Sequence, residues 1–164
     1  MKKIGLLSDT HSTVHSRVIH FLKSCDEIWH AGDIGHYSVI KDLRRIAKVR
    51  AVYGNIDHEI LKSQWPENAI FTVENMKIFM THIGGYPGKY TPRARRIIDN
   101  VKPDIFISGH SHILKVIPDR ERKLLHINPG AAGNFGYHST ITCIRFVLDN
   151  GTIDDLEVFD LGGR

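Results

Sequence analysis

The chain has little cysteine and no long hydrophobic run. Its 164 residues include two cysteines, Cys25 and Cys143, which lie far apart and without C-x-x-C spacing. A disulfide framework and a zinc–thiolate site are therefore not expected. No apolar run approaches the roughly 20 residues of a membrane-spanning helix. The first run, at residues 4–7, is too short for a secretory signal. We expect a cytoplasmic protein with no membrane segment.

A strong charge of one sign is also missing. The formal net charge is +4, and the basic residues are spread over two segments, 41–50 and 93–96, rather than gathered in one patch. This distribution is typical of solvated helix surfaces more than of a nucleic-acid interface, although it would also favour an anionic substrate. The length and a hydrophobic content of 41% predict one globular domain over residues 1–164.

Short apolar runs alternate with helical patterns in the first third of the chain. Strands are predicted at residues 3–7, 27–30 and 49–53. Helices are expected from Ser12 or Thr13, and again after an N-cap at Ser38. This alternation predicts an α/β fold with parallel strands, and ligands bind such sheets beyond the carboxyl ends of the strands.

The rest of the chain is richer in strands. Residues 58–70 predict a loop, and a hairpin follows around Glu74-Asn75. Residues 83–90 form a Gly- and Pro-rich loop, either a surface connection or a substrate lid. A helix is then expected to start at Thr91-Pro92. Further strands, which finish the first sheet or form a second, are predicted at 104–108, 114–117, 123–127, 140–148 and 152–159.

Metal-ligating side chains follow five of these strands. They provide three oxygen and four imidazole ligands and no thiolate: Asp9, His11, Asp33, Asn55, His82, His110 and His112. This mixture suits Mn²⁺, Fe²⁺, Ni²⁺ or Zn²⁺ better than Mg²⁺ or Ca²⁺. Two divalent ions about 3.5–4 Å apart bind and activate a phosphoryl group, and they need a shared carboxylate, for which Asp33 is the natural residue. The Asn55 amide can bind an ion through oxygen and donate to a phosphate.

The same residues fall in five ordered blocks that resemble the calcineurin-like metallophosphoesterase superfamily. The blocks are Asp9-Thr10-His11, Gly32-Asp33, Gly54-Asn55-Ile56-Asp57, His82 and Gly109-His110-Ser111-His112. The short chain and the sequence His-Ala-Gly-Asp-Ile-Gly at residues 30–35 are similar to small bacterial and archaeal phosphodiesterases of the YfcE type. The resemblance implies an α/β fold of the four-layer αββα sandwich type, with the metal site at the sheet edge.

The family pattern also implies how the ligands are divided. Asp9, His11 and His112 would hold one ion, and Asn55, His82 and His110 the other, with Asp33 bridging. The implied reaction is in-line attack of a metal-bound hydroxide on a small phosphodiester, without a phospho-enzyme. Mn²⁺ is the favoured ion, with Ni²⁺, Fe²⁺ and Zn²⁺ as alternatives.

One position departs from many relatives. Ile56 stands where they carry a histidine that protonates the leaving group or stabilises the transition state. His36 and His58, in loops just past the ligand blocks, are candidates for a catalytic role, or they are solvent-exposed loop histidines. Asp57 is expected to orient the Asn55 loop or a ligand histidine, and His30 is expected to be structural.

Two other functions remain in competition with a phosphodiesterase. A retromer-coat subunit on this fold is a non-catalytic scaffold with several ligand positions altered, whereas all seven positions keep ligand-competent side chains here. A phosphomonoesterase or nuclease would use the same site, but nuclease relatives usually carry extra domains, so nucleic acid is not expected. The sequence leaves the substrate and the oligomeric state open, a homo-oligomer included.

Overall fold

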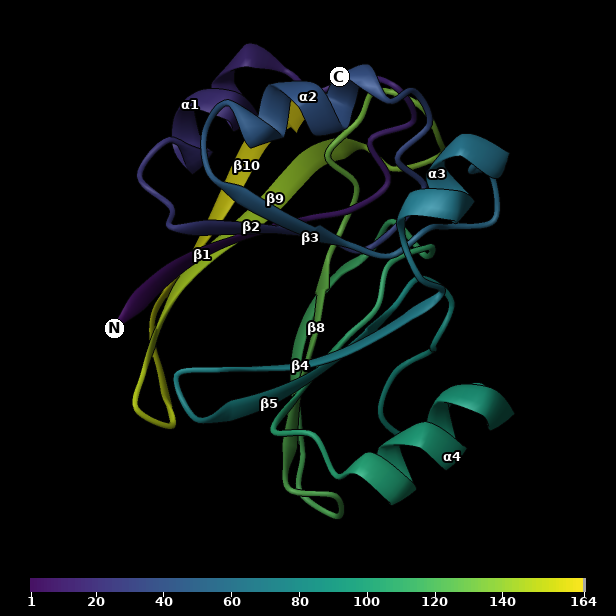
Figure 1. Ribbon diagram of the computed structural model, residues 1–164, viewed down its shortest axis with the longest axis vertical. Helices are drawn as coiled ribbons and strands as arrows, with labels where there is room; N and C mark the ends of the chain where they lie inside the picture. The colour runs from purple at the N-terminus through teal and green to yellow at the C-terminus, as the bar shows by residue number, and fades with distance from the viewer. Residues whose placement is uncertain (164) are drawn as a thin grey trace.

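Two β-sheets face one another in the middle of the molecule, and helices cover their outer sides (Figure 1). The computed structural model describes residues 1–163. The helices are α1 (Ser16–Leu22), α2 (Ser38–Arg44), α3 (Glu59–Gln64) and α4 (Pro92–Val101). The strands are β1 (Lys2–Leu7), β2 (Glu27–His30), β3 (Lys48–Ala51), β4 (Asn68–Val73), β5 (Met76–Thr81), β6 (Ile105–Ile107), β7 (Leu114–Asp119), β8 (Leu124–Pro129), β9 (Thr140–Asp149) and β10 (Thr152–Gly163).

The two sheets share the C-terminal strands between them. The first sheet has the order β10-β9-β1-β2-β3, with β1, β2 and β3 parallel as predicted and β9 antiparallel to β1. The second has the order β4-β5-β6-β8-β7, with a parallel centre of β5, β6 and β8. Among the late strands, β9 and β10 therefore finish the first sheet, and β6, β7 and β8 help to build the second. Both arrangements that the sequence allows for these strands occur.

Hydrophobic residues form three packed interfaces between the four layers. Neighbouring residues of β1 take opposite sides, with Leu6 in the core between the sheets and Leu7 under α1 and α2. The third interface packs α4 on the second sheet through Ala94 and Ile98. Each fully buried aliphatic side chain contributes about 1.5–3 kcal/mol relative to an exposed one. These interfaces make the predicted four-layer αββα sandwich, and Figure 1 shows α1 and α2 on one outer side and α4 on the other.

The first helix starts later than its apolar pattern predicts. It begins at Ser16 with His15 as N-cap, not at Ser12 or Thr13. The reason lies in the preceding loop, where the Ser12 N–H donates to the Ile34 carbonyl at 2.9 Å and Ser12 has φ of 77°. Because a left-handed residue cannot continue a right-handed helix, this segment forms a turn closed by the Thr13 N–H and the Thr10 carbonyl, and the helix begins only after it.

Two further local predictions are wrong. Ser38 is the first residue of α2 rather than its N-cap, and Tyr37 holds the cap position without a side-chain hydrogen bond. The predicted loop at residues 58–70 contains α3 and the start of β4. Since Leu61 is the one buried residue of α3, this helix has no apolar stripe from which it could be recognised. No helix in residues 1–163 is long and apolar enough to cross a membrane.

Candidate metal centre

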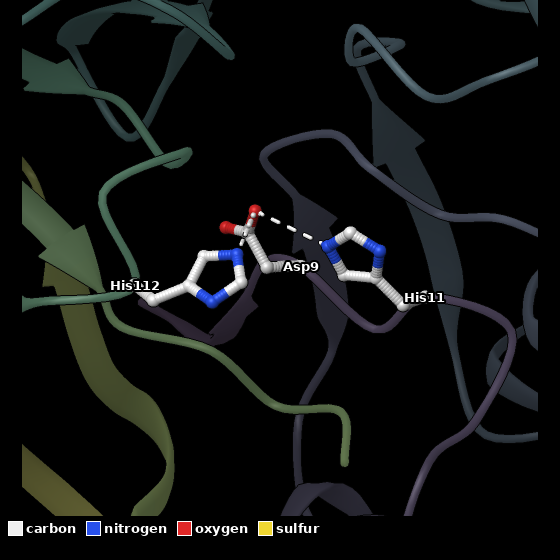
Figure 2. Close-up of side chains that lie close together, drawn as sticks. All are labelled: Asp9, His11 and His112. Atoms are coloured by element: carbon white, nitrogen blue, oxygen red, sulfur yellow. Dashed lines mark ion pairs between the residues drawn. The ribbon is translucent and has the colours of Figure 1, made fainter. Parts of the chain in front are cut away.

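The predicted ligands meet where five strands end. They follow β1, β2, β3, β5 and β6, and two groups of three have ligand atoms within 4.8 Å of one another. The first group is Asp9, His11 and His112, and the second is Asp33, His82 and His110. Figure 2 shows both imidazoles of the first group turned toward the Asp9 carboxylate, which lies between them.

Asp33 stands between the two groups. Its Oδ2 atom lies 3.5 Å from Nε2 of His11 in the first group and 3.2 Å from Nε2 of His82 in the second. Its Oδ1 atom accepts a hydrogen bond from the Ile56 N–H at 3.1 Å. One oxygen is therefore fixed by the backbone, and the other faces ligands of both groups, as a bridging carboxylate requires.

Several polar atoms at the centre are buried without a hydrogen-bond partner. In residues 1–163 these include Oδ1 of Asp9 and Nε2 of His11 and His82. Oδ2 of Asp9, by contrast, accepts from the Ser8 hydroxyl at 2.6 Å and the His110 N–H at 3.1 Å. Because an unpaired buried polar atom is costly, these converging atoms fit divalent cations as their missing partners. Ser8 is a site residue that the sequence analysis did not single out.

The backbone at the site is held in an unfavourable conformation. Left-handed φ values of 44° to 69° occur at five predicted ligands: Asp9, His11, Asp33, His110 and His112. Each such non-glycine residue costs on the order of 1–2 kcal/mol. Strain of this kind persists where surrounding structure enforces it, and it gathers at functional sites. A Cβ at Gly54 would overlap Asp33, which explains the glycine before Asn55.

Two of the predicted ligand histidines, His82 and His112, are oriented by a contact on the far side of the ring. Nδ1 of His82 donates to the Ala31 carbonyl at 2.8 Å, which leaves Nε2 for a metal ion. Nδ1 of His112 lies 3.0 Å from Nδ1 of His138, whose Nε2 donates to the Gly133 carbonyl at 2.9 Å. With His138 neutral, its Nδ1 accepts from His112, and Nε2 of His112 keeps its lone pair toward the centre.

Asp57 joins two of the ligand loops. Its buried carboxylate accepts from the Gly54 N–H at 2.8 Å, the Gly35 N–H at 2.8 Å and the Ile34 N–H at 3.2 Å. These donors lie in the loops that carry Asn55 and Asp33. Asp57 therefore positions the Asn55 loop, as the sequence predicts, and the Asp33 loop as well.

His30 has a structural role. It is fully buried, and burial lowers its pKa to about 4 although nearby carboxylates such as Asp57 act in the opposite direction. Its Nδ1 accepts from the Gly32 N–H at 3.2 Å, and its Nε2 bonds the Thr10 hydroxyl at 3.0 Å. The neutral ring thus links β2 to the two loops that follow β1 and β2.

The electrostatics of the centre favour positive charge. Burial by itself would raise the pKa of Asp9 and Asp33, but His112 beside Asp9 and His82 beside Asp33 lower both values. Burial would lower the pKa of His82, yet the carboxylates of Asp33, 3.2 Å away, and of Asp9 raise it. A divalent cation would meet the same carboxylate field and would compete with the proton on His82.

The centre opens into a cleft of about 470 Å³. Asn55 lines it together with Asp33 and four histidines of the loops, so the predicted substrate-binding amide is beside the ligand groups. His36 and His58 are not among the lining residues. His36 is exposed and bonds Ser38, and His58 is exposed at the start of α3. The structure does not bring either histidine to the cleft.

The chain belongs to the calcineurin-like phosphoesterase superfamily, whose domain model matches residues 1–151. It is 30% identical over 133 residues to a probable metallophosphoesterase of Methanothermobacter thermautotrophicus, covering 78% of this chain and 76% of that protein. It is 32% identical over 136 residues to another from Methanocaldococcus jannaschii, covering 78% and 67%. Membership implies divalent ions and a phosphoric ester as substrate.

Solved structures share the whole fold. An archaeal phosphodiesterase has a TM-score of 0.77 at 24% identity, over 97% of this chain and 99% of that chain. Vps29 of Chaetomium thermophilum has a TM-score of 0.76 at 14% identity, over 98% and 97%. Vps29 of Entamoeba histolytica with bound Zn²⁺ has a TM-score of 0.74 at 18% identity, over 96% and 98%. These identities are low, so the likeness concerns the fold alone.

Proposed function

We propose that this protein is a phosphodiesterase that uses two divalent ions, Mn²⁺ first among them, to hydrolyse a small phosphodiester. The observation that carries the proposal is the pair of ligand groups around Asp33, with buried unpaired atoms facing one another. Asp9, His11 and His112 would hold one ion and His82, His110 and Asn55 the other, with Asp33 shared. A cytoplasmic location stays a prediction.

The charge of the cleft favours a diester over a monoester. A phosphodiester carries one negative charge near neutral pH, whereas a monoester approaches two. None of the twelve residues that line the cleft is lysine or arginine. This cleft therefore offers no cationic side chain for a second phosphate charge, and the nearest cations, Arg93 beside His82 and Lys115 beside His110, line separate pockets.

The protein's own residues would orient the substrate. Bound divalent ions would supply Lewis-acid activation of water and of the phosphoryl oxygens. Asn55 is placed to donate from its amide to a non-bridging oxygen. In the reaction a water gives up a proton to solvent, its oxygen forms a bond to phosphorus, the ester P–O bond breaks, and the leaving oxygen departs with the electron pair. Ile56 provides no proton for that oxygen, so ester groups that leave as stable anions react best.

The alternative is a non-catalytic metal-binding scaffold. The fold is as close to Vps29 proteins as to the archaeal phosphodiesterase, so overall shape does not decide between them. The site favours catalysis because every predicted ligand position keeps a competent side chain and the ligand groups open into a cleft.

The test compares hydrolysis of bis(p-nitrophenyl) phosphate and p-nitrophenyl phosphate with Mn²⁺, for the wild type and Asp33→Asn. The proposal expects faster cleavage of the diester and its near-complete loss in the variant, because the shared carboxylate is gone. If the wild type binds Mn²⁺ but hydrolyses neither ester, the result would instead support the scaffold. Faster monoester cleavage would overturn the diester specificity.

A further inference from the structure

One wall of the cleft is apolar and exposed. It consists of Ile56, Ile113, Phe135 and Tyr137, which are 37%, 55%, 69% and 108% exposed. Ten large hydrophobic residues are exposed in the described chain, and Phe135 and Tyr137 are the two aromatic ones. Their gathering at one cleft marks a binding surface, because exposed apolar groups that are scattered singly need no explanation.

The aromatic side chains stand next to the ligand groups. The Phe135 ring centre lies 5.3 Å from that of His11, with the ring planes tilted by 38°. A substituent one ester bond from a phosphorus atom held near His11 would therefore reach Phe135. The wall belongs to the same cleft as the centre and continues directly from it.

The loop that carries these rings is fixed against the site. Gly136, between Phe135 and Tyr137, has φ of 124°, and a Cβ there would overlap the His112 ring. His138 bonds His112 and the Gly133 carbonyl. The Gly133 N–H in turn donates to the Asp9 carbonyl at 3.1 Å. These contacts hold the loop on both sides of Phe135 and Tyr137, which lowers the backbone entropy lost when a ligand binds.

The charge and polarity of the lining define what this surface takes. It has no lysine or arginine for a second anionic group, and its large apolar faces match a flat, neutral ring. We propose that the cleft selects phosphodiesters with an aromatic substituent, held by Phe135 and Tyr137 one ester link from phosphorus. This inference rests on the proposed function and names its substrate class. Both an aryl ester and a nucleoside bring a flat ring to this wall, the aryl ring directly on the ester oxygen and the nucleobase beyond the sugar.

Three diesters with the same leaving group test the selection. Methyl, phenyl and thymidine-5′ p-nitrophenyl phosphates all release p-nitrophenolate and differ in the retained substituent. Stacking of one ring is worth about 1–3 kcal/mol, so kcat/KM should be roughly 5- to 150-fold higher for the phenyl or nucleoside ester than for the methyl ester. A preference for the thymidine ester over the phenyl ester would identify nucleosides, and the reverse order simple aryl groups.

Alanine substitutions test whether Phe135 and Tyr137 cause the preference for aromatic diesters. Phe135→Ala and Tyr137→Ala should each reduce the phenyl-to-methyl ratio of kcat/KM several-fold, mainly through KM. Ile70→Ala is the matched control, because Ile70 is 51% exposed but does not line this cleft. Its ratio should equal that of the wild type. Binding without turnover gives a second readout: the Zn²⁺-loaded protein should bind monomethyl phenylphosphonate roughly 10-fold more tightly than monomethyl methylphosphonate.

The outcomes separate this inference from the proposed function. Hydrolysis of all three diesters at equal kcat/KM, with equal binding of the two phosphonates, would overturn the aromatic selection and leave the phosphodiesterase standing. Tighter binding of the phenylphosphonate without turnover of any diester would support the surface while overturning catalysis. A phenyl preference that survives both alanine substitutions would contradict the assignment to Phe135 and Tyr137.

Discussion

Two buried carboxylates, one at the start of β2 and one just beyond its end, differ in how the protein compensates their charge. At the amino end, Glu27 is 1% exposed and has three donors: Lys2 at 2.9 Å, Arg50 at 2.7 Å and the Trp29 indole at 3.2 Å. Beyond the carboxyl end, Asp33 is 2% exposed, and its Oδ2 faces histidines whose Nε2 atoms have no hydrogen-bond partner. Glu27 thus has a full set of protein donors, whereas Asp33 lies beside histidine nitrogens and an Asp9 oxygen that have none.

This difference in compensation distinguishes a carboxylate that stabilises the fold from carboxylates that would bind a ligand. Glu27 is compensated by the protein itself, because two cations and an N–H complete its hydrogen bonds. The Asp9–Asp33 centre is incomplete without added positive charge, although it is built on strained backbone. A buried charge with all its partners stabilises the fold, whereas one that lacks partners marks a place for a ligand. Substitutions at the two ends should therefore affect different properties.

The largest contrast is expected from adding metal. An ion that binds the folded state at 100 times its dissociation constant stabilises it by about 2.7 kcal/mol, or roughly 5–10 °C in Tm for a chain of this size. Mn²⁺ should raise the Tm of the wild type by this order, and Asp33→Asn should lose most of the shift. Thermal unfolding with and without MnCl₂, together with elemental analysis of bound metal, measures this effect.

The matched variant at the other end of the strand is Glu27→Gln. It should unfold at a lower temperature than the wild type yet keep the full Mn²⁺-induced shift and the same bound metal. Equal loss of the shift in both variants would mean that the two ends do not differ in function.

Next in size is the effect of His138 on one ligand group. His138→Ala removes the acceptor behind His112, and such partners are typically worth 10–100-fold in metal affinity. One of two ions should bind about 10-fold or more weakly by calorimetry, and His138→Gln, which keeps an acceptor, should recover part of the loss. His82 offers no comparable test, because it is oriented by the backbone carbonyl of Ala31, which a side-chain substitution does not remove.

An equal weakening of both ions in His138→Ala would point to general disruption of the loop. Unchanged binding of both would show that His138 does not orient His112.

A smaller effect, on stability alone, is expected at Glu27. Burial would raise its pKa, but Arg50, Lys2 and Trp29 together lower it from 4.5 to about 2. Because the folded pKa is lower than the unfolded one, this stabilisation is complete above about pH 4.5 and is lost as pH falls toward about 2. Glu27→Gln should lower the free energy of unfolding by about 2 kcal/mol at neutral pH, since part of the pairing is solvent-screened.

Urea unfolding in EDTA across this pH range tests the sign. The difference between wild type and Glu27→Gln should shrink as pH falls from about 5 to about 3. A difference that stays constant or grows would show that the Glu27 charge does not provide the stabilisation.

The smallest effect is expected for a histidine outside the centre. The half-buried His15 accepts a hydrogen bond from the Arg17 N–H at 3.1 Å at the start of α1. His15→Ala should cost about 0.5 kcal/mol in unfolding and leave diester hydrolysis and metal content within error. A large loss of activity in this variant would mean that histidines act through something other than the proposed ligand set.

Much of the fold could be predicted because its strands are short, buried and apolar. Residues 27–30 were predicted as a strand and are β2, since all four side chains are buried. α3 could not be predicted because burial of Leu61 alone leaves no helical pattern. The start of α1 depends on the hydrogen bond between Ser12 and Ile34, which joins two loops 22 residues apart, so local propensity cannot predict it.

The sequence by itself determined which candidate ligands stand directly after strands, because that depends on residue types and on short apolar runs. Only the tertiary structure decided how those residues are placed around one another and which side chains orient them. Asp33 faces both groups, Ser8 and Asp57 hold the loops, and His138 orients His112 from 26 positions away. Such contacts depend on which sheet edge each loop reaches, and that is set by packing of the whole chain rather than by any local pattern.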